Sequence, residues 1–185
     1  LYTKVKVTDV TEILEKTVKN GETISRLLYK DPVTKQAVAK YQDIPFYKHQ
    51  IRVSMRNIGR VDPEDLDDAL AHGAYSGLAK ALFAMTPDLV IAEIEASGLR
   101  GRGGAGFVTA RKWKACRKAK GDRKFVLCNG DEGDPGAFKD RSIMEGDPHS
   151  VIEGMIIGAY AIGAHEGYLY VRDEYPLAVV NMTRA

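Results

Sequence analysis

Only two cysteines occur in this 185-residue chain, and they do not form a Cys-x-x-Cys pair. Cys116 and Cys128 alone cannot build a disulfide framework or complete a metal site, so we expect both to be packing residues. The chain also has little excess of one charge over the other. The net charge of +2 gives no general attraction to nucleic acid or to a membrane surface, so a nucleic-acid partner is not expected.

Long apolar runs are absent as well. No segment is apolar and long enough to span a bilayer, and the first residues lack the apolar core of a signal peptide. We therefore expect a cytoplasmic protein. The chain lacks an initiator methionine and ends within a helical pattern, which predicts a fragment of a longer protein. With 44% apolar and 28% charged residues, it can still bury the core of one domain or slightly more.

Helix-capping residues and the spacing of apolar residues predict short helices and strands in the first third of the chain. Alternation over residues 2–7 indicates a strand, and Asp9 with Glu12 forms an acidic capping box for the helix that follows. Residues 29–60 have weak periodicity and two X-Pro pairs, which favours an extended connector that ends in a candidate strand over 51–55.

Three helices are predicted next, ahead of a glycine-rich segment. The first begins at 62–65, the second covers about 75–85, and the third begins at Thr86 and ends at Gly98. Ser97–Phe107 then contains five glycines, two arginines and one aromatic ring, directly before another helical pattern. The glycine-rich segment therefore joins two helices.

This segment is typical of an anion-binding loop. Glycine lets backbone N–H groups approach a phosphate closely, and the helix that follows adds free N–H groups and a partial positive charge. The spacing Gly101-x-Gly103-x-x-Gly106 formally fits the dinucleotide fingerprint, but that fingerprint needs a preceding strand. An ordinary Rossmann site is therefore excluded, and no Gly-Lys-Ser/Thr ending supports a P-loop. Phe107 adds a ring that can stack on a ligand.

The helix after this segment begins with cations, whereas the other helices carry acidic residues near their starts. The cations are Arg111, Lys112 and Lys114. Each cation at the positive end of a helix costs a few tenths of a kcal/mol up to about 1 kcal/mol, which a bound anion would offset. A solvated basic face is the alternative, because further cations follow over residues 117–120.

A second loop is rich in carboxylates. A buried-strand pattern at 124–128 runs into Asn129–Arg141, which holds three glycines, one proline and four carboxylates. Such a loop after a strand is typical of ligand sites in α/β proteins, and its carboxylates suit the hydroxyls of ribityl or ribose chains and ring N–H groups. Two alternatives stay open. One is a divalent-metal site made by Asp131, Glu132 and Asp134, and the other is an acidic turn paired with Lys139 and Arg141.

The last part of the chain predicts a parallel βαβ unit. Asp147 and Pro148 begin a helix with apolar residues on nearly every face, which indicates a central buried helix. A strand over 167–172 follows and ends at Asp173-Glu174-Tyr175-Pro176. Two strands joined by a helical crossover run parallel, so their acidic C-terminal ends face one crevice, and the fold class is α/β. The four histidines have no triad or metal partner at an informative spacing.

Five motifs taken together resemble a known family. They are Ser97–Phe107, Lys112-Trp113, Cys128–Phe138, Glu153–Ile157 and Tyr170–Pro176. As a set they are similar to the FMN- and NADH-binding flavoprotein subunit of respiratory complex I and of its hydrogenase relatives. The run Gly-Asp-Glu-Gly-Asp-Pro-Gly-Ala-Phe is closer to the NAD(P)-linked, often electron-bifurcating, iron hydrogenases, because complex I usually has glutamate at the position of Asp134.

The resemblance implies a domain organisation. Residues 62–185 would be the N-terminal half of the FMN-binding domain, a parallel βαβ arrangement with helices, and residues 30–61 would be a connector. Residues 1–29 resemble the last strand and helix of a thioredoxin-like 2Fe-2S domain without its cysteines. The family's later flavin-binding segment and its Cys-x-x-Cys-x-x-Cys cluster motif would lie beyond this segment.

The resemblance also implies site residues. The cofactor-binding residues are Gly101, Arg102, Gly103, Gly104, Ala105, Gly106, Phe107, Lys112, Asn129, Asp131, Asp134, Tyr170 and Glu174. The glycine-rich backbone and Lys112 would lie against the FMN phosphate and the bound nucleotide, and Phe107 would stack on the nicotinamide nucleotide. Asn129, Asp131 and Glu174 would hold the isoalloxazine and ribityl groups. Asp134 would contact NADH.

The implied function is that of an FMN-dependent oxidoreductase subunit that passes electrons between NAD(P)H and iron-sulfur clusters in a multisubunit hydrogenase or dehydrogenase. Hydride would move from nicotinamide C4 to flavin N5, and single electrons would then pass to a cluster, with no protein side chain as general acid or base. Expected cofactors are FMN with NAD(H) or NADP(H), while 4Fe-4S and 2Fe-2S clusters belong to the longer protein and not to this segment. Expected partners are other subunits, including a thioredoxin-like 2Fe-2S subunit, with membrane contact only through them.

Two further interpretations stay open beside this one: a complex I flavoprotein subunit, and a noncatalytic truncated assembly module that has lost flavin. The sequence also departs from the family pattern. The family usually has proline, glycine, leucine and glycine where this chain has Val108, Ala110, Arg111 and Asp173. These departures predict an altered loop backbone and an altered charge near the flavin.

Overall fold

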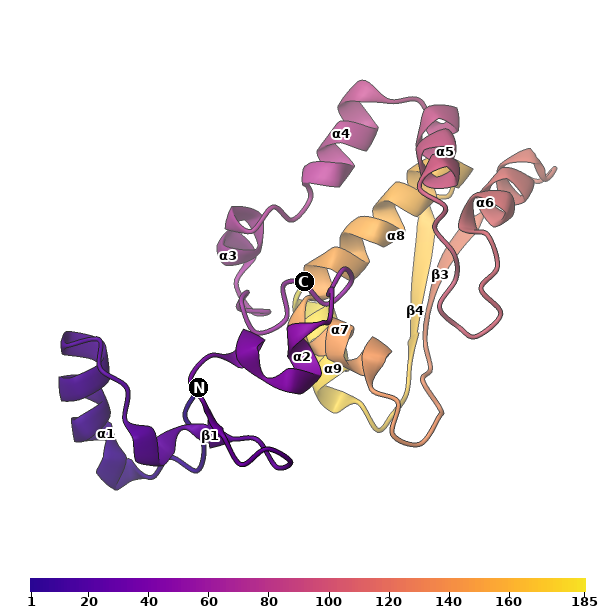
Figure 1. The fold of residues 1–185 in the computed structure, drawn as a ribbon. Helices are drawn as coiled ribbons and strands as arrows, with labels where there is room; N and C mark the ends of the chain where they lie inside the picture. Colours follow the sequence, from indigo (N-terminus) through magenta and orange to yellow (C-terminus); the bar gives the residue numbers. More distant parts are fainter. The chain divides into compact units, whose positions relative to one another are not determined.

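The computed structural model describes residues 1–185, which form two compact units, Leu1–Arg52 and Val53–Ala185 (Figure 1). The units are defined by packing, so the domain assignment expected from the sequence stays a prediction. No helix in either unit has the length and apolar character needed to cross a bilayer. Both cysteines are free thiols and half-buried, and burial raises the pKa of the Cys128 thiol above its usual value.

The first unit consists of short elements around a small hairpin. In chain order they are the 3-10 turn Val7–Asp9, α1 (Val10–Glu12), its π-helical continuation Ile13–Lys19, the 3-10 turn Ser25–Leu27, β1 (Tyr29–Lys30), β2 (Ala37–Val38), the 3-10 turn Tyr41–Asp43, and α2 (Pro45–Lys48). β1 and β2 pair antiparallel. Asp31 holds the turn between them, because its carboxylate accepts hydrogen bonds from the N–H groups of Val33 and Thr34.

Both strands predicted in this part of the chain are wrong. In the segment 2–7 only Tyr2 pairs, through a single antiparallel bridge with Leu28. Lys4 has a left-handed backbone with φ of 54°, which interrupts an extended chain. The segment 51–55 forms bends and turns with no strand beside it to complete a ladder. The connector expected to be extended instead contains the β1–β2 hairpin and α2.

The helix after Asp9 forms, but the predicted acidic capping box does not. Asp9 Oδ2 accepts a hydrogen bond from the Lys6 N–H at 2.8 Å, so this carboxylate caps the 3-10 turn that precedes α1. Asp9 and Glu12 both pair with Arg26. The Lys6 N–H and the Arg26 guanidinium together hold the pKa of Asp9 below its usual value.

The second unit begins with the predicted helices. They are α3 (Leu66–Ala71), α4 (Ser76–Ala84), α5 (Pro87–Ala96) and, after the glycine-rich segment, α6 (Thr109–Lys118). Asp65 caps α3, so this helix begins at the end of the expected 62–65 start. Thr86 caps α5 by accepting from the Leu89 N–H, and Gly98, with φ of +67°, ends the turn after α5. The glycine-rich segment therefore joins two helices, as predicted.

The second half of this unit is a parallel βαβ arrangement, which confirms the predicted fold class. Its elements are β3 (Phe125–Gly130), α7 (Lys139–Gly146), α8 (Pro148–Ile162), β4 (Glu166–Val171) and α9 (Pro176–Arg184). β3 and β4 pair in parallel from Phe125 opposite Glu166 to Gly130 opposite Val171. α8 packs against both strands and against α4 to α7 and α9, so it is central, although Ile156 on it remains 39% exposed (Figure 1).

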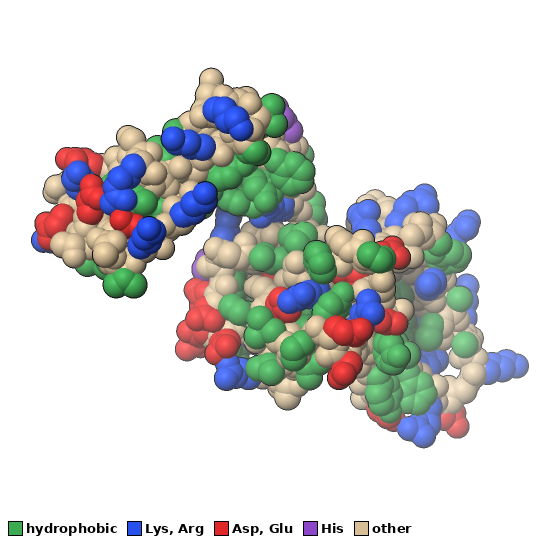
Figure 2. Space-filling model, turned by 90° about the horizontal axis from the view of Figure 1, so that it is seen from below, with side chains coloured by type: hydrophobic (Ala, Val, Ile, Leu, Met, Phe, Trp, Pro, Cys, Tyr) green, Lys and Arg blue, Asp and Glu red, His purple; other side chains and the backbone are tan.

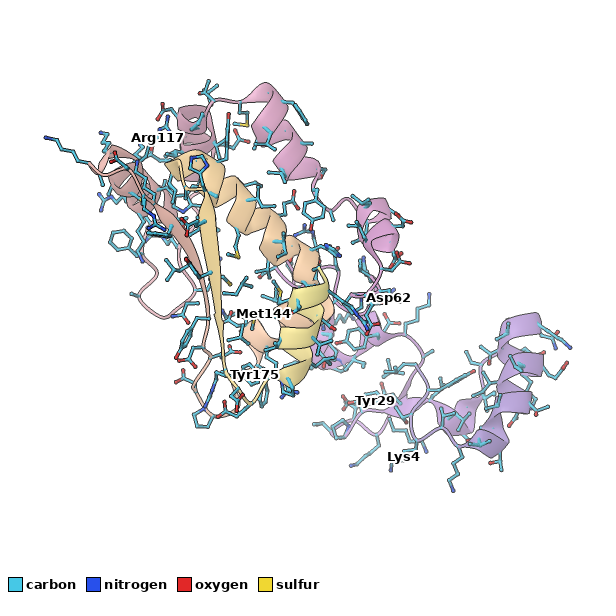
Figure 3. The ribbon with its side chains drawn as sticks, turned by 180° about the vertical axis from the view of Figure 1, so that it is seen from behind. Lys4, Tyr29, Asp62, Arg117, Met144 and Tyr175 are labelled. Atoms are coloured by element: carbon cyan, nitrogen blue, oxygen red, sulfur yellow. The ribbon has the colours of Figure 1, made fainter.

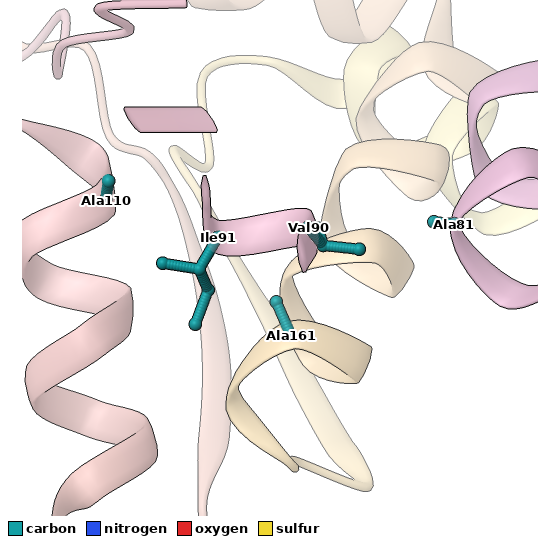
Figure 4. Close-up of a cluster of buried hydrophobic side chains, with 5 residues drawn as sticks. All are labelled: Ala81, Val90, Ile91, Ala110 and Ala161. Carbon is teal, nitrogen blue, oxygen red and sulfur yellow. The ribbon is translucent and has the colours of Figure 1, made fainter. Parts of the chain in front are cut away.

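Two apolar clusters hold the parts of this unit that carry the predicted site. The first contains Ala81, Val90, Ile91, Ala110 and Ala161, and it fixes α5 and α6, the helices on either side of the glycine-rich segment, to α8 (Figure 4). The second contains Met144, Tyr175, Ala178 and Met182, and it joins α7 and α9 to α8 and to Val171 at the end of β4. Small alanines in the first cluster let the helices approach closely.

Candidate functional site

The glycine loop, residues 97–108, is closed at its base by backbone contacts. The Gly101 N–H donates to the carbonyl of Phe107 at 2.8 Å, and Arg100 lies opposite Val108 in an antiparallel bridge. The Arg100 guanidinium also reaches across the loop and donates to the carbonyl of Gly106 at 3.1 Å. The base of the loop is therefore fixed while its tip projects from α5 and α6.

The tip of the glycine loop presents unused backbone donors. No backbone N–H from Arg102 to Phe107 donates a hydrogen bond within the chain. Gly104 and Gly106 have φ values of +108° and +59°, which residues with a side chain rarely adopt. α6 then begins after Val108 with no capping side chain and no acidic residue in its first turn. This end of the site suits an anion.

A cation and an aromatic ring lie together beside the loop. The Lys112 Nζ is 5.4 Å from the centroid of the Phe107 ring, and the Phe107 side chain is 48% exposed. Lys114 and Arg117, further along α6, form ion pairs with carboxylates of α5. Lys112 forms no ion pair, so its charge is available to a ligand.

The two acidic loops follow the C-terminal ends of the parallel strands. We use this name for residues 129–138, which include the last two residues of β3, and residues 172–175, after β4. Asn129 lies opposite Tyr170 in the strand register, and both side chains are exposed. Asn129 Oδ1 accepts a hydrogen bond from the Asp131 N–H at 3.0 Å. Tyr175 of the second loop belongs to the apolar cluster that contains Met144, and both residues are labelled in Figure 3.

Arg172 connects the two acidic loops. Its Nη2 donates to Glu174 Oε1 at 3.1 Å, its Nε lies 3.7 Å from Asp131 Oδ1, and its Nη1 donates to the Glu132 carbonyl at 2.9 Å. The pKa of Glu174 lies below its usual value because its carboxylate accepts its own backbone N–H and lies beside the Arg172 guanidinium. The Arg172 guanidinium therefore lies beside a carboxylate from each acidic loop.

Both carboxylate oxygens of Glu132 already accept hydrogen bonds, so its side chain does not join those of Asp131 and Asp134. Its Oε1 accepts from the Lys139 N–H at 3.0 Å and its Oε2 accepts from the Asp140 N–H at 2.9 Å, at the start of α7. No group of three His, Cys, Asp or Glu side chains in the structure could hold a metal ion. The three carboxylates of the metal alternative therefore do not converge in this structure, because Glu132 caps a helix.

The acidic-turn interpretation holds only in part, because Lys139 pairs with Asp140, the fourth carboxylate of the segment 129–141. The side chains of Lys139 and Arg141 pair with Asp140 and Glu145 of their own helix, and not with the first three carboxylates of the loop. Asp134 is exposed at the tip of the loop, where its carbonyl accepts from the Ala137 N–H at 3.0 Å. The carboxylate of Asp134 has no hydrogen bond or ion pair in the chain and is free to meet a ligand.

The predicted site residues thus form two groups. One is the glycine loop with Lys112, and the other contains Asn129, Asp131, Tyr170 and Glu174, with Asp134 at the edge. No hydrogen bond or ion pair joins the glycine loop to the acidic loops. Sequence reasoning missed Arg172 and the structural role of Glu132. The available signal was the position of Arg172 between the last strand and the acidic pair that follows it.

Comparison with known proteins gives a consistent result. The family model described as the Nuo51 FMN-binding domain matches residues 94–185. The chain is 54% identical over 138 residues to the NADP-reducing hydrogenase subunit HndC of Solidesulfovibrio fructosivorans, covering 75% of this chain and 28% of the relative. It is 50% identical over 133 residues to a subunit of the NADH-quinone oxidoreductase of Rhizobium meliloti, covering 72% of this chain and 32% of the relative.

A solved structure shares the fold. A chain in the crystal structure of a NAD+-reducing [NiFe]-hydrogenase in the H2-reduced state superposes with a TM-score of 0.57 and 27% sequence identity. The match covers 98% of this chain and 28% of that chain. The present chain therefore spans about three tenths of the length of the relatives that it matches.

Proposed function

Because residues 94–185 belong to the family of the Nuo51 FMN-binding domain, we propose that this chain binds FMN between the glycine loop and the acidic loops. The longer protein would be an oxidoreductase subunit that passes electrons between NAD(P)H and iron-sulfur clusters. FMN, when bound, accepts hydride from a nicotinamide and releases electrons singly. The protein binds and orients the reactants, and no side chain of the site is assigned a proton-transfer role.

One observation carries the proposal: the unpaired backbone N–H groups from Arg102 to Phe107 lie next to the unpaired cation of Lys112. This donor set suits the phosphate of FMN. The opposite charge of Asp131 and Glu174 suits the hydroxyls of the ribityl chain and the ring N–H group of the isoalloxazine. The two groups of residues therefore match the two chemically different ends of one molecule.

The remaining site residues are assigned by their exposure. Asn129 and Tyr170 lie opposite each other and exposed at the ends of the strands, where the flavin ring would lie. Phe107 offers its exposed ring to the nicotinamide nucleotide, and the free carboxylate of Asp134 would accept from a hydroxyl or amide of NAD(P)H.

The proposal extends to the partners, the location and the domains of the longer protein. The relatives named above are subunits of hydrogenases and of an NADH-quinone oxidoreductase, which supports a multisubunit assembly. We place a thioredoxin-like 2Fe-2S subunit among the partners, the assembly in the cytoplasm, and the 4Fe-4S and 2Fe-2S clusters outside this segment. Residues 1–29, 30–61 and 62–185 would be a thioredoxin-like remnant, a connector and the FMN-binding domain.

A flavin titration tests the proposal. The visible absorption spectrum of the purified chain is recorded, and FMN and riboflavin are then titrated separately. We expect FMN to bind more tightly than riboflavin, because riboflavin lacks the phosphate, and we expect NADH to bleach the bound flavin. No binding at saturating FMN would contradict the proposal for this chain.

A charge variant sharpens this test. Lys112→Gln should lower the affinity for FMN and leave that for riboflavin unchanged, because only the phosphate end loses a partner. Lys118→Gln is the matched control, since Lys118 carries the same charge at the far end of α6. Equal losses for FMN and riboflavin in Lys112→Gln would contradict the assignment of the phosphate end.

A noncatalytic assembly module is the second candidate, and an exposed apolar surface favours it. Leu127, Tyr168 and Tyr170 on the strands are 71%, 55% and 65% exposed, although parallel sheets are normally covered on both faces. An apolar groove of about 550 Å³ also lies between α8 and β4. Figure 2 shows hydrophobic side chains exposed in several clusters between charged ones. Self-association of the flavin-free chain in light scattering, with no FMN binding, would support this candidate.

A further inference from the structure

We propose that Glu132 is a positioning residue that holds the two acidic loops as one unit and thereby strengthens FMN binding without touching FMN. The inference rests on the proposed function, since it concerns the same site. Glu132 is half-buried, whereas Asp131 before it and Asp134 after it are exposed. Asp131 and Asp134, which are expected to contact the ligand, thus flank a residue whose side chain packs against the rest of the chain.

The side chain of Glu132 connects the first acidic loop to α7. Its two carboxylate oxygens accept from the N–H groups of Lys139 and Asp140 at 3.0 and 2.9 Å, with a longer contact of 3.4 Å from the Arg141 N–H. Phe138, at the N-cap position of α7, offers no capping side chain. Glu132 therefore caps α7 from seven residues upstream and closes the loop of residues 132–139 into a ring.

The main chain of Glu132 connects the same loop to the second acidic loop. Its carbonyl accepts from Arg172 Nη1 and from the Tyr175 hydroxyl, each at 2.9 Å. Tyr175 is only 6% exposed, and the guanidinium carbons of Arg141 and Arg172 lie 5.4 and 5.9 Å from its ring centroid. Tyr175, which forms part of this second connection, is therefore itself buried and in contact with two arginines.

The two connections meet at one residue, and this gives Glu132 its proposed role. Arg172, held by the Glu132 carbonyl, is also the group that lies beside Asp131 and Glu174. A change at Glu132 would therefore be felt by both carboxylates that are expected to meet the ribityl chain and the flavin ring. Loops ordered before the ligand arrives do not have to be ordered on binding, which increases affinity.

The test compares Glu132 with Glu166, a glutamate at the opposite end of the two paired strands. Glu132→Gln replaces one acceptor oxygen with an amide that faces the N–H groups of α7, and Glu132→Ala removes both acceptors. Glu166→Gln is the control, because Glu166 pairs with Arg123 and Tyr168 at the start of β4, the end of the strand away from both acidic loops. Each variant is first checked for native far-ultraviolet circular dichroism.

Three quantities are measured in the 185-residue chain. Hydrogen exchange of the Lys139 and Asp140 amides, read without flavin, should speed up in Glu132→Gln and further in Glu132→Ala. The dissociation constant for FMN should rise about tenfold in Glu132→Gln, which corresponds to about 1.4 kcal/mol. The visible circular dichroism of bound FMN at saturation should change as well, because it reports the orientation of the ring. Glu166→Gln should change none of these.

The outcomes separate this inference from the proposed function. If the wild-type chain binds no FMN, the proposed function fails for this chain, and the exchange data alone decide whether Glu132 holds the loops. Unchanged exchange in Glu132→Ala overturns the inference. It is also overturned if exchange speeds up while FMN affinity and circular dichroism stay at their wild-type values, or if Glu166→Gln weakens FMN binding equally.

Discussion

Gly130 at the end of β3 lies against Met144 of the second apolar cluster, and its replacement by alanine is predicted to damage both the site and the core. A Cβ built on Gly130 would lie 2.9 Å from both Cε and Sδ of Met144 and 3.2 Å from the carbonyl oxygen of Tyr170. Met144 is 2% exposed within the second apolar cluster, so its side chain has little room to move. The Tyr170 oxygen belongs to the backbone of β4, so the ends of the two strands would have to separate.

The expected loss of stability is the difference between two effects. Overpacking of this kind costs about 1–3 kcal/mol. Replacing glycine by alanine also restricts the unfolded chain, which contributes about 0.4–1 kcal/mol in the opposite direction. We expect Gly130→Ala to lower the free energy of unfolding by about 1–2 kcal/mol, a sizeable fraction of the roughly 5–15 kcal/mol of a typical domain. Because Asn129 and Asp131 flank this position, FMN affinity should fall too.

The assay is urea unfolding followed by the fluorescence of Trp113, the single tryptophan, which packs on Gly158 of α8. Gly154→Ala is the matched control, because a Cβ at this position of α8 would meet no atom within 4 Å. That control should raise the free energy of unfolding by about 0.5–1 kcal/mol through helix propensity. If Gly130→Ala unfolds at the same urea concentration as Gly154→Ala, the close approach at the end of β3 does not limit the fold and the reasoning is refuted.

Three further predictions concern the ligand, a helix cap and pH. Phe107→Ala should weaken reduction of bound flavin at low NADH while leaving FMN affinity unchanged, because its exposed ring is assigned to the nicotinamide; an equal loss of FMN affinity argues against that assignment. Asp147→Ala should lower the free energy of unfolding by about 1–3 kcal/mol, because Asp147 is buried, caps α8 and accepts from the Asn57 amide at 3.0 Å. The pKa of Glu174 is lowered, so its contribution to stability should be complete above its ordinary pKa and lost as pH falls through the lowered value. A carbon-13 NMR titration of Glu174 should show this low midpoint, and Arg172→Gln should raise it.

Local sequence signals predicted much of the second unit, because its elements carry strong caps and glycine stops. Thr86 and Asp147 cap the helices that the sequence assigned to them, and the parallel pair of strands follows from the long apolar helix between them. The first unit was predicted less well. A single left-handed residue, Lys4, ends the extended chain after Tyr2, and no local pattern reveals such a backbone.

The site was predictable in its parts but not in its connections. The glycine loop and the acidic loops stand out because each concentrates one kind of chemistry in about a dozen residues. Glu132, in contrast, looked like another ligand-facing carboxylate, since only the folded chain brings α7 within reach of its side chain. Likewise, the contact of Arg172 with Asp131 spans two strands that pair only in the folded state.

The two halves of the site differ in rigidity, and this leads to the last prediction. The acidic loops are held by Glu132 and Arg172, whereas the tip of the glycine loop is exposed and keeps its N–H groups unpaired. FMN should therefore order the glycine loop and leave the acidic loops nearly unchanged. Hydrogen exchange with and without FMN should show strong new protection of the amides from Arg102 to Phe107 and little change at Lys139 and Asp140, which are already bonded. Riboflavin should give much weaker protection of the glycine loop, because it has no phosphate to accept these hydrogen bonds. Equal protection by FMN and riboflavin would instead place the phosphate away from the glycine loop and contradict the arrangement proposed above.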